Sequence, residues 1–128
     1  MARILVVDDD EDILLFIESA LEGQGHVVTG AVSAYEALEY LRQAPADLII
    51  LDLRMPGMTG LDFLDCLRKR HGRLPIVVYS SYPSLSNDFA VWDSHVVGVL
   101  TKPAAVEELV STVKQALETA GKARPGSP

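Results

Sequence analysis

Five short apolar runs recur along the chain, and each is followed by a segment in which the apolar residues are spaced differently. Within the runs nearly every position is apolar and many residues are β-branched, which is typical of strands buried on both faces of a parallel sheet. Such strands require a layer of helices on each face. The five predicted strands cover residues 4–7, 26–29, 48–51, 75–79 and 96–100.

The segments after the runs carry apolar residues three and four positions apart, which is the spacing of one face of an α-helix. Acidic residues open the first segment, where the positive end of a helix dipole favours them, and Gly23 and Gly25 mark its end. Ser33 and Glu36 have the spacing of a capping box at the start of the second helix. The apolar faces of the predicted helices lie within residues 13–21, 37–41, 61–67, 85–92 and 106–117.

Strand and helix alternate strictly along the chain. This order predicts an α/β fold in which right-handed crossovers join a parallel sheet that is covered by helices on both faces. We expect a doubly wound five-stranded sheet in the flavodoxin-like order 2-1-3-4-5, with three layers of α, β and α. In such a sheet ligands bind beyond the carboxyl ends of the strands, at the switch point where the first and third strands are neighbours.

Composition is consistent with one folded domain. The chain has 128 residues, of which 48% are hydrophobic and 23% are charged, so a packed core is expected. We assign the domain to residues 1–120. Residues 121–128, which contain Gly, Pro, Ser and Lys, are expected to form a flexible tail or the start of a linker.

Charge and apolar length narrow the range of partners. The net charge of -7 argues against direct binding of nucleic acid. No apolar run approaches the length of a membrane span, and the N-terminus enters the first strand without a signal-peptide pattern. We therefore expect a cytoplasmic location and no membrane attachment. The chain has one cysteine, so it cannot form an intramolecular disulfide.

Charged and polar residues stand at the predicted carboxyl ends of four strands. Asp8 and Asp9 follow the first strand, Asp52 the third, Ser80 the fourth and Lys102 the fifth. Because the first and third strands are neighbours, the three carboxylates are expected to converge, where they would repel one another. A hard divalent cation such as Mg²⁺ relieves that repulsion and leaves Asp52 placed to attack a phosphoryl group. Lys102 and Ser80 would add a positive charge and a hydroxyl donor.

Each of these residues has an ordinary interpretation when it is taken singly. Acidic residues favour a solvated helix start, a lone lysine suits the surface and a serine suits a turn, but their convergence favours a site. A flavodoxin-like cofactor binder would need a Ser-, Thr- or Gly-rich loop after the first strand, and that loop is acidic here. A haloacid-dehalogenase-type phosphatase would carry a second Asp two residues after Asp52, where this chain has Arg54.

Four motifs contain the strand-end residues. At their order and spacing they resemble one known family, the receiver domains of bacterial two-component response regulators, and together they are far more specific than any one alone. The resemblance extends from about residue 3 to residue 120. The motifs are Ile4-Leu5-Val6-Val7-Asp8-Asp9, Leu51-Asp52-Leu53-Arg54-Met55-Pro56-Gly57-Met58-Thr59-Gly60, Ser80-Ser81 and Thr101-Lys102-Pro103.

The resemblance implies that Asp52 is the phosphoacceptor. The donor would be a phosphohistidine on a sensor histidine kinase or on a histidine phosphotransfer protein. By the same resemblance, Asp9 and Asp52 would bind Mg²⁺, or Mn²⁺ in its place, directly. Asp8 would help through water, and Arg54 would offer its backbone carbonyl. The domain would be a signalling switch rather than an enzyme, because it would catalyse only its own phosphorylation and slow dephosphorylation.

The resemblance also gives roles to residues further along the chain. Ser80 and Lys102 would contact the phosphoryl group, and a cis peptide bond would precede Pro103. Phosphorylation would alter the binding of a downstream protein target, and the domain would be a monomer or a weak homodimer. The alternative is a pseudo-receiver, a docking module that works without phosphorylation. Such a module usually lacks one of the acidic pair, the acceptor or the lysine, and all are present here.

The chain departs from the family pattern at positions that govern switching. Val99 stands where receivers usually carry an aromatic residue that reorients with the switch. Arg54 and Tyr82 occupy positions that tune dephosphorylation in the family, and both are large. We therefore expect a long-lived phosphoryl state and an altered route for the signal.

Overall fold

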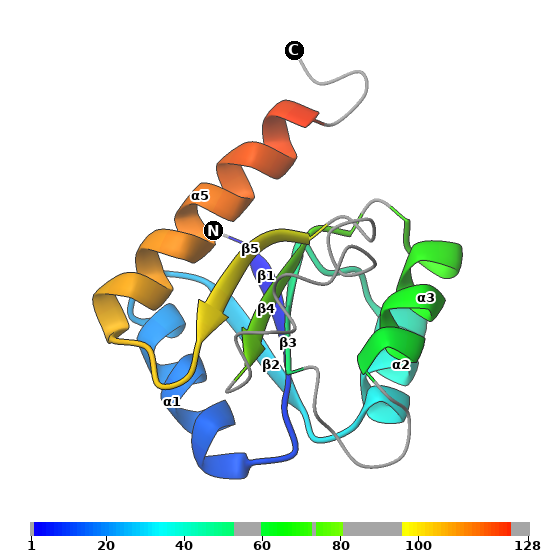
Figure 1. Cartoon of the computed structure of the whole chain (residues 1–128), viewed down its shortest axis with the longest axis horizontal. Helices are drawn as coiled ribbons and strands as arrows, with labels where there is room; N and C mark the ends of the chain where they lie inside the picture. Colours follow the sequence, from blue (N-terminus) through cyan, green and yellow to red (C-terminus); the bar gives the residue numbers. More distant parts are fainter. Residues whose placement is uncertain (1, 53–59, 73, 81–95, 124–128) are drawn as a thin grey trace.

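The computed structural model describes residues 2–52, 60–72, 74–80 and 96–123. Within them five strands form one sheet in the order β2-β1-β3-β4-β5, and every neighbouring pair is parallel (Figure 1). The predicted fold class and strand order are confirmed. The strands are β1 Arg3–Val7, β2 Val27–Ala31, β3 Leu48–Leu51, β4 Ile76–Ser80 and β5 Val96–Thr101.

Helices cover both faces of the sheet. Figure 1 shows α1 and α5 on one side and α2 and α3 on the other. No helix in the described ranges is long and apolar enough to cross a membrane. The helix predicted around residues 85–92 lies outside the described residues. The described helices are α1 Glu11–Glu22, α2 Ala34–Gln43, α3 Gly60–Arg70 and α5 Val106–Ala123.

The apolar runs of the inner strands divide their side chains between two hydrophobic clusters. In β1, Leu5 and Val7 pack into the cluster beneath α2 and α3, whereas Ile4 and Val6 pack into the cluster beneath α1 and α5. All four side chains are at most 2% exposed. Because successive side chains of a strand point to opposite faces, a strand covered on both sides must be apolar at every position.

Polar side chains fix the starts of two helices. Asp10 precedes α1, and its Oδ1 accepts two backbone N–H groups of the first turn at 2.9 and 3.4 Å. Ser33 precedes α2, and its Oγ accepts the N–H of Glu36 at 3.1 Å, as the sequence predicts. The reciprocal bond differs from a standard capping box, because Glu36 Oε1 accepts the N–H of Val32 at 3.4 Å. Gly25, at a φ of 89°, turns the chain from α1 towards β2 in a conformation that favours glycine.

Four strands differ from their predicted bounds by one or two residues at an end, and only β3 has the bounds predicted. β2 extends to Ala31 because its backbone stays in register with β1 up to the Val7–Ala31 pair. The register between β4 and β5 shifts once, so that Gly98 pairs with Val77. A Cβ atom at Gly98 would lie 3.1 Å from Thr112 Cγ2, and the missing side chain therefore lets α5 pack closely on β5.

Helix α5 is longer than its apolar pattern predicts. It continues through Ala123, three residues beyond the predicted end of the domain at residue 120, and the division of the chain into domain and tail stays a prediction. A hydrophobic pattern reports the buried part of a helix and gives no signal for a polar last turn. Gly121 costs this helix only about 1 kcal/mol relative to alanine, and Ala, Lys and Glu around it favour the helix.

Candidate functional site

The candidate site lies at the carboxyl ends of β1, β3 and β5. Asp8 follows the last residue of β1, and Asp52 follows the last residue of β3. Backbone pairing continues one residue beyond both strands: the N–H of Asp8 donates to Ala31 O, and the N–H of Asp52 donates to Val7 O, each at 3.0 Å. These hydrogen bonds fix the points at which the two carboxylates leave the sheet.

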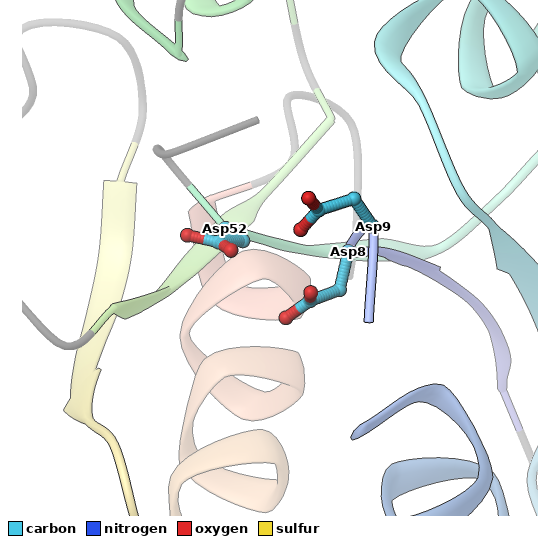
Figure 2. A group of neighbouring side chains, drawn as sticks. All are labelled: Asp8, Asp9 and Asp52. Carbon is cyan, nitrogen blue, oxygen red and sulfur yellow. The ribbon is translucent and has the colours of Figure 1, made fainter. Parts of the chain in front are cut away.

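Asp8, Asp9 and Asp52 form one cluster. One oxygen from each carboxylate lies within 4.8 Å of the other two, and Figure 2 shows the three side chains beside one another at the end of the sheet. Asp8 is 2% exposed and Asp52 is 6% exposed, whereas Asp9 is exposed. The expected convergence is therefore present, with two of the three negative charges buried. Buried charges of one sign are costly unless cations lie against them.

Lys102 supplies one such cation. Its Nζ donates hydrogen bonds to Asp8 Oδ2 at 2.6 Å and to Asp52 Oδ2 at 3.1 Å. Burial alone would lower the pKa of this ammonium, but the hydrogen bond to Asp8 and the charge of Asp52 outweigh burial and raise the pKa. The lysine is thus held charged between the two carboxylates. The peptide bond that follows it, Lys102-Pro103, is cis, as the resemblance suggests.

Asp8 is anchored through both of its oxygens. Oδ1 accepts the N–H of Asp10 at 2.8 Å, and Oδ2 accepts from Lys102. Burial raises the pKa of Asp8, the charge of Asp52 adds to the rise, and the bonds from Lys102 and Asp10 oppose it. Since Asp10 also caps α1, Asp8 joins the end of β1 to the start of the helix. The carboxylate of Asp8 is therefore held by hydrogen bonds at both of its oxygens.

The donor set fits a divalent cation. In the described part of the site three carboxylates lie together, and the ammonium of Lys102 pairs with two of them, Asp8 and Asp52. All the carboxylate donors are hard oxygens, and Mg²⁺ usually takes one or two carboxylates with several waters. The exposure of Asp9 gives such a cation access from solvent. The observed residues therefore have the number, type and placement that a magnesium site requires.

Of the other predicted site residues, some lie within the described residues and some lie outside them. Ser80 ends β4 and pairs with Thr101 of β5, which brings its backbone to the same edge of the sheet as Lys102. Val99 is half-buried and packs against the cluster beneath α2 and α3. Arg54 and Tyr82 lie outside the described residues, so their tuning roles stay predictions.

Two residues at this edge carry functions that the pattern did not reveal. Asp10 is the cap of α1 and a donor to Asp8, although it reads as one more acid in an acidic run. Tyr79 reads as an apolar strand position, yet its hydroxyl accepts the N–H of Ala104 at 3.3 Å and its ring centre lies 5.5 Å from Lys102 Nζ. The hydroxyl itself could have indicated such a contact, because a buried tyrosine hydroxyl usually finds a hydrogen-bond partner.

Comparison with known proteins identifies the family. The family model described as the response regulator receiver domain matches residues 4–114. The chain belongs to this family. Receiver domains of two-component systems are regulators that work with sensor kinases, and they generally bind Mg²⁺ at an acidic pocket. The resemblance inferred from the strand-end motifs is thus confirmed.

Two curated relatives illustrate the similarity of this receiver domain to longer regulators. It is 33% identical to the DNA-binding transcriptional regulator NtrC of Escherichia coli over 114 residues, which are 89% of this chain and 24% of NtrC. It is 35% identical to the transcriptional regulatory protein PrrA of Mycobacterium tuberculosis over 119 residues, which are 93% of this chain and 51% of PrrA. The chain therefore spans about a quarter of one relative and about half of the other.

Solved receiver structures share the fold of this domain over nearly its whole length. A CheY-like receiver domain protein from Methanospirillum hungatei is 28% identical, with a TM-score of 0.88 over 95% of this chain and 98% of that one. The response regulator TrrA of Thermotoga maritima, solved in complex with Mg²⁺ and BeF, is 31% identical, with a TM-score of 0.83 over 91% of this chain and 99% of that one.

Proposed function

We propose that this receiver is a phosphorylation-activated switch and that Asp52 is its phosphoacceptor. The observation that carries the proposal is the placement of Asp52, whose carboxylate is buried, lies 3.1 Å from the Lys102 ammonium and belongs to a cluster with Asp8 and Asp9. A carboxylate of this kind can act as a nucleophile towards phosphorus when cations neutralise the surrounding charge.

The cation would be Mg²⁺, with Mn²⁺ as a substitute. Asp9 and Asp52 would hold it directly, Asp8 would act through water because both of its oxygens already accept hydrogen bonds, and Arg54 would offer its backbone carbonyl. When bound, the cation neutralises negative charge on the phosphoryl oxygens. The complex of TrrA with Mg²⁺ and BeF supports this assignment by analogy.

The reaction is a transfer from a phosphohistidine of a sensor histidine kinase or a histidine phosphotransfer protein. An Asp52 oxygen bonds to phosphorus, the phosphorus–nitrogen bond breaks, and the released imidazole nitrogen takes a proton from solvent. Lys102 is placed to pair with the transferred group, because its ammonium already contacts Asp52, and Ser80 would donate its hydroxyl. Slow attack by water on the acyl phosphate would reset the switch.

The partners follow from this chemistry. A phosphoryl group on Asp52 adds negative charge at the carboxyl edge of the sheet, beside the end of β3, and we infer that a downstream protein reads the resulting change. The net charge of -7 disfavours direct contact with nucleic acid. We place the domain in the cytoplasm, without membrane attachment, as a monomer or a weak homodimer.

Intact mass after incubation with a small acyl-phosphate donor and Mg²⁺ tests the proposal. The wild-type domain is expected to gain one phosphoryl group, and the gain is expected to disappear in Asp52→Asn and when a chelator removes Mg²⁺. Asp65→Asn is the matched control, because Asp65 is an exposed aspartate of α3 that pairs with Lys69 at 3.0 Å. This variant should be phosphorylated like the wild type.

Two results would refute the assignment. Failure of the wild-type domain to gain mass would favour a pseudo-receiver that docks without phosphorylation. A gain that survives in Asp52→Asn would place the phosphoryl group on another residue. The time course of mass loss after removal of the donor then measures the phosphoryl lifetime, which Arg54 and Tyr82 are expected to make long.

A further inference from the structure

Tyr79 is a buried ionisable residue that the proposed chemistry does not use. It is 4% exposed at the carboxyl end of β4, in the hydrophobic cluster beneath α1 and α5. Its hydroxyl accepts the backbone N–H of Ala104 at 3.3 Å. Ala104 lies in the loop from β5 to α5, two residues after Lys102 and two before the first residue of the helix. The hydroxyl therefore ties the end of one strand to the loop that follows its neighbour.

The ring of Tyr79 is also close to the ammonium of Lys102. Lys102 Nζ lies 5.5 Å from the ring centre, within the distance at which a cation is attracted to an aromatic face. The same nitrogen donates to Asp8 and Asp52. Tyr79 thus meets the loop at two points: its hydroxyl accepts the N–H of Ala104, and its ring lies near the ammonium of Lys102. The ring and the two carboxylates together limit the positions that the long side chain can take.

We propose that Tyr79 is a positioning residue that holds the Lys102 ammonium beside the phosphoacceptor and thereby sets the rate of phosphoryl transfer. This inference rests on the proposed function of Asp52. Tyr79 has no hydrogen bond to the three carboxylates in the described part of the site, so its effect must pass through Lys102 and its loop. A flexible lysine that is free to turn away neutralises transferred charge less often, because catalysis depends on groups already in place.

The test compares Tyr79→Phe, which removes only the hydroxyl, with Tyr79→Leu, which also removes the ring. Phosphorylation rates are measured with Mg²⁺ and a small acyl-phosphate donor. We expect Tyr79→Phe to be slower by about threefold to tenfold, the scale of one neutral hydrogen bond. Tyr79→Leu should be slower by more than about tenfold, since a misplacement of about 1 Å can cost as much as 10²-fold.

Lys102→Met supplies the decisive background. If Tyr79 acts through the ammonium, both substitutions should change the rate less than about twofold once Lys102 is methionine, which is the non-additivity expected of coupled residues. A purely structural role would slow both backgrounds equally, and that result overturns the inference.

Tyr40→Phe is the matched control. The Tyr40 hydroxyl accepts from Thr29 Oγ1 at 3.2 Å, and Tyr40 packs against the cluster on the opposite face of the sheet. Tyr40→Phe removes a comparable hydrogen bond that lies away from the site, so the phosphorylation rate of this variant should equal that of the wild type. A loss of rate as large as that in Tyr79→Phe would make the effect general and contradict a specific role.

Hydrogen exchange gives a readout that does not require phosphorylation. The Ala104 amide should exchange about tenfold faster in Tyr79→Phe, since its acceptor is gone. The Leu109 amide, which donates to Ala105 O at 3.0 Å, should be unchanged. If the wild type takes no phosphoryl group, the proposed function fails, but the contact between Tyr79 and the Lys102 loop can still be tested by this exchange and by thermal unfolding of the single and double variants. An unchanged exchange rate of the Ala104 amide in Tyr79→Phe would overturn the inference. Stability losses of the Tyr79 and Lys102 variants that simply add in the double variant would also overturn it.

Discussion

Replacing Lys102 by methionine removes the ammonium between two buried carboxylates and keeps most of the apolar length of the side chain. The side chains of Asp8 and Asp52 are 2% and 8% exposed, so water cannot readily replace the lost partner. Removing one member of a buried ion pair typically costs about 3–5 kcal/mol. We expect the free energy of unfolding at pH 7 in metal-free buffer to fall towards the lower end of that range.

Protonation sets the upper bound on this loss. A carboxyl group with the ordinary pKa of 3.8 takes up a proton at pH 7 at a cost of about 4 kcal/mol, because each pH unit is worth about 1.4 kcal/mol. One proton is enough, since a protonated Asp8 no longer repels the neighbouring carboxylate. At pH 5 the same step costs only about 1.6 kcal/mol, so the loss should shrink to less than about 2 kcal/mol.

The sign follows from proton binding. In the variant the folded state binds a proton that the unfolded chain releases above pH 3.8, so the stability of the variant relative to the wild type rises as the pH falls. Mg²⁺ should narrow the gap at pH 7, because a ligand that binds only the folded state adds stability and neutralises the same carboxylates.

Urea unfolding followed by circular dichroism, at pH 7 and pH 5 with chelator or Mg²⁺, measures these differences. Lys69→Met is the control, because the ion pair of Lys69 with Asp65 joins side chains that are 70% and 44% exposed. That variant should lose less than about 1 kcal/mol under every condition. A loss in Lys102→Met no larger than this, or equal at both pH values, would refute the reasoning.

Three further predictions test other parts of the fold. Ala105 precedes α5, and its carbonyl accepts the N–H of Leu109 at 3.0 Å, but its side chain offers no acceptor to the first turn of the helix. Ala105→Ser should therefore raise the free energy of unfolding in urea by about 0.5–2 kcal/mol. An unchanged urea midpoint would contradict this capping argument. His26 Nδ1 accepts the N–H of Ala2 at 3.1 Å, and burial lowers the pKa of His26 below 6.5. The contribution of His26 to stability should therefore be complete above pH 6.5 and be lost as the pH falls towards the lowered pKa, because the unfolded state then binds the extra proton. In His26→Gln, the free energy of unfolding measured across this range should no longer show that fall with pH. Gly98→Ala should cost roughly 1–3 kcal/mol through overpacking against Thr112, and a penalty that is no smaller in a Thr112→Ser background would contradict that contact.

Most of the fold, and the meeting of the strand-end carboxylates with Lys102, could be predicted from the sequence. The continuous apolar runs identify strands buried on both faces, and strict alternation with helices leaves few topologies for a parallel sheet. Once the strand order is known, Asp8, Asp9, Asp52 and Lys102 must lie at one edge, since each follows a strand end. Their convergence is therefore a consequence of topology rather than of any local motif.

The features that the pattern missed depend on contacts between distant segments. An apolar run does not reveal that the Tyr79 hydroxyl will meet the N–H of Ala104, because the partner is a backbone group of another loop. The shift in register at Gly98 depends on how closely α5 packs on β5, which no local propensity encodes. The last turn of α5 gives no apolar signal, so its length could not be read from periodicity.

The contact between Lys102 and Asp8 has a consequence for the order of events during synthesis. The two residues are 94 positions apart, so the site needs both β1 and β5, the first and last strands along the chain. A chain that has emerged only as far as β4 holds every carboxylate of the cluster and lacks the cation that compensates two of them. Because contacts between remote segments form late in folding, the ion pairs of Lys102 with Asp8 and Asp52 should form only when β5 joins the sheet. Formation of these ion pairs would then report that the sheet is complete.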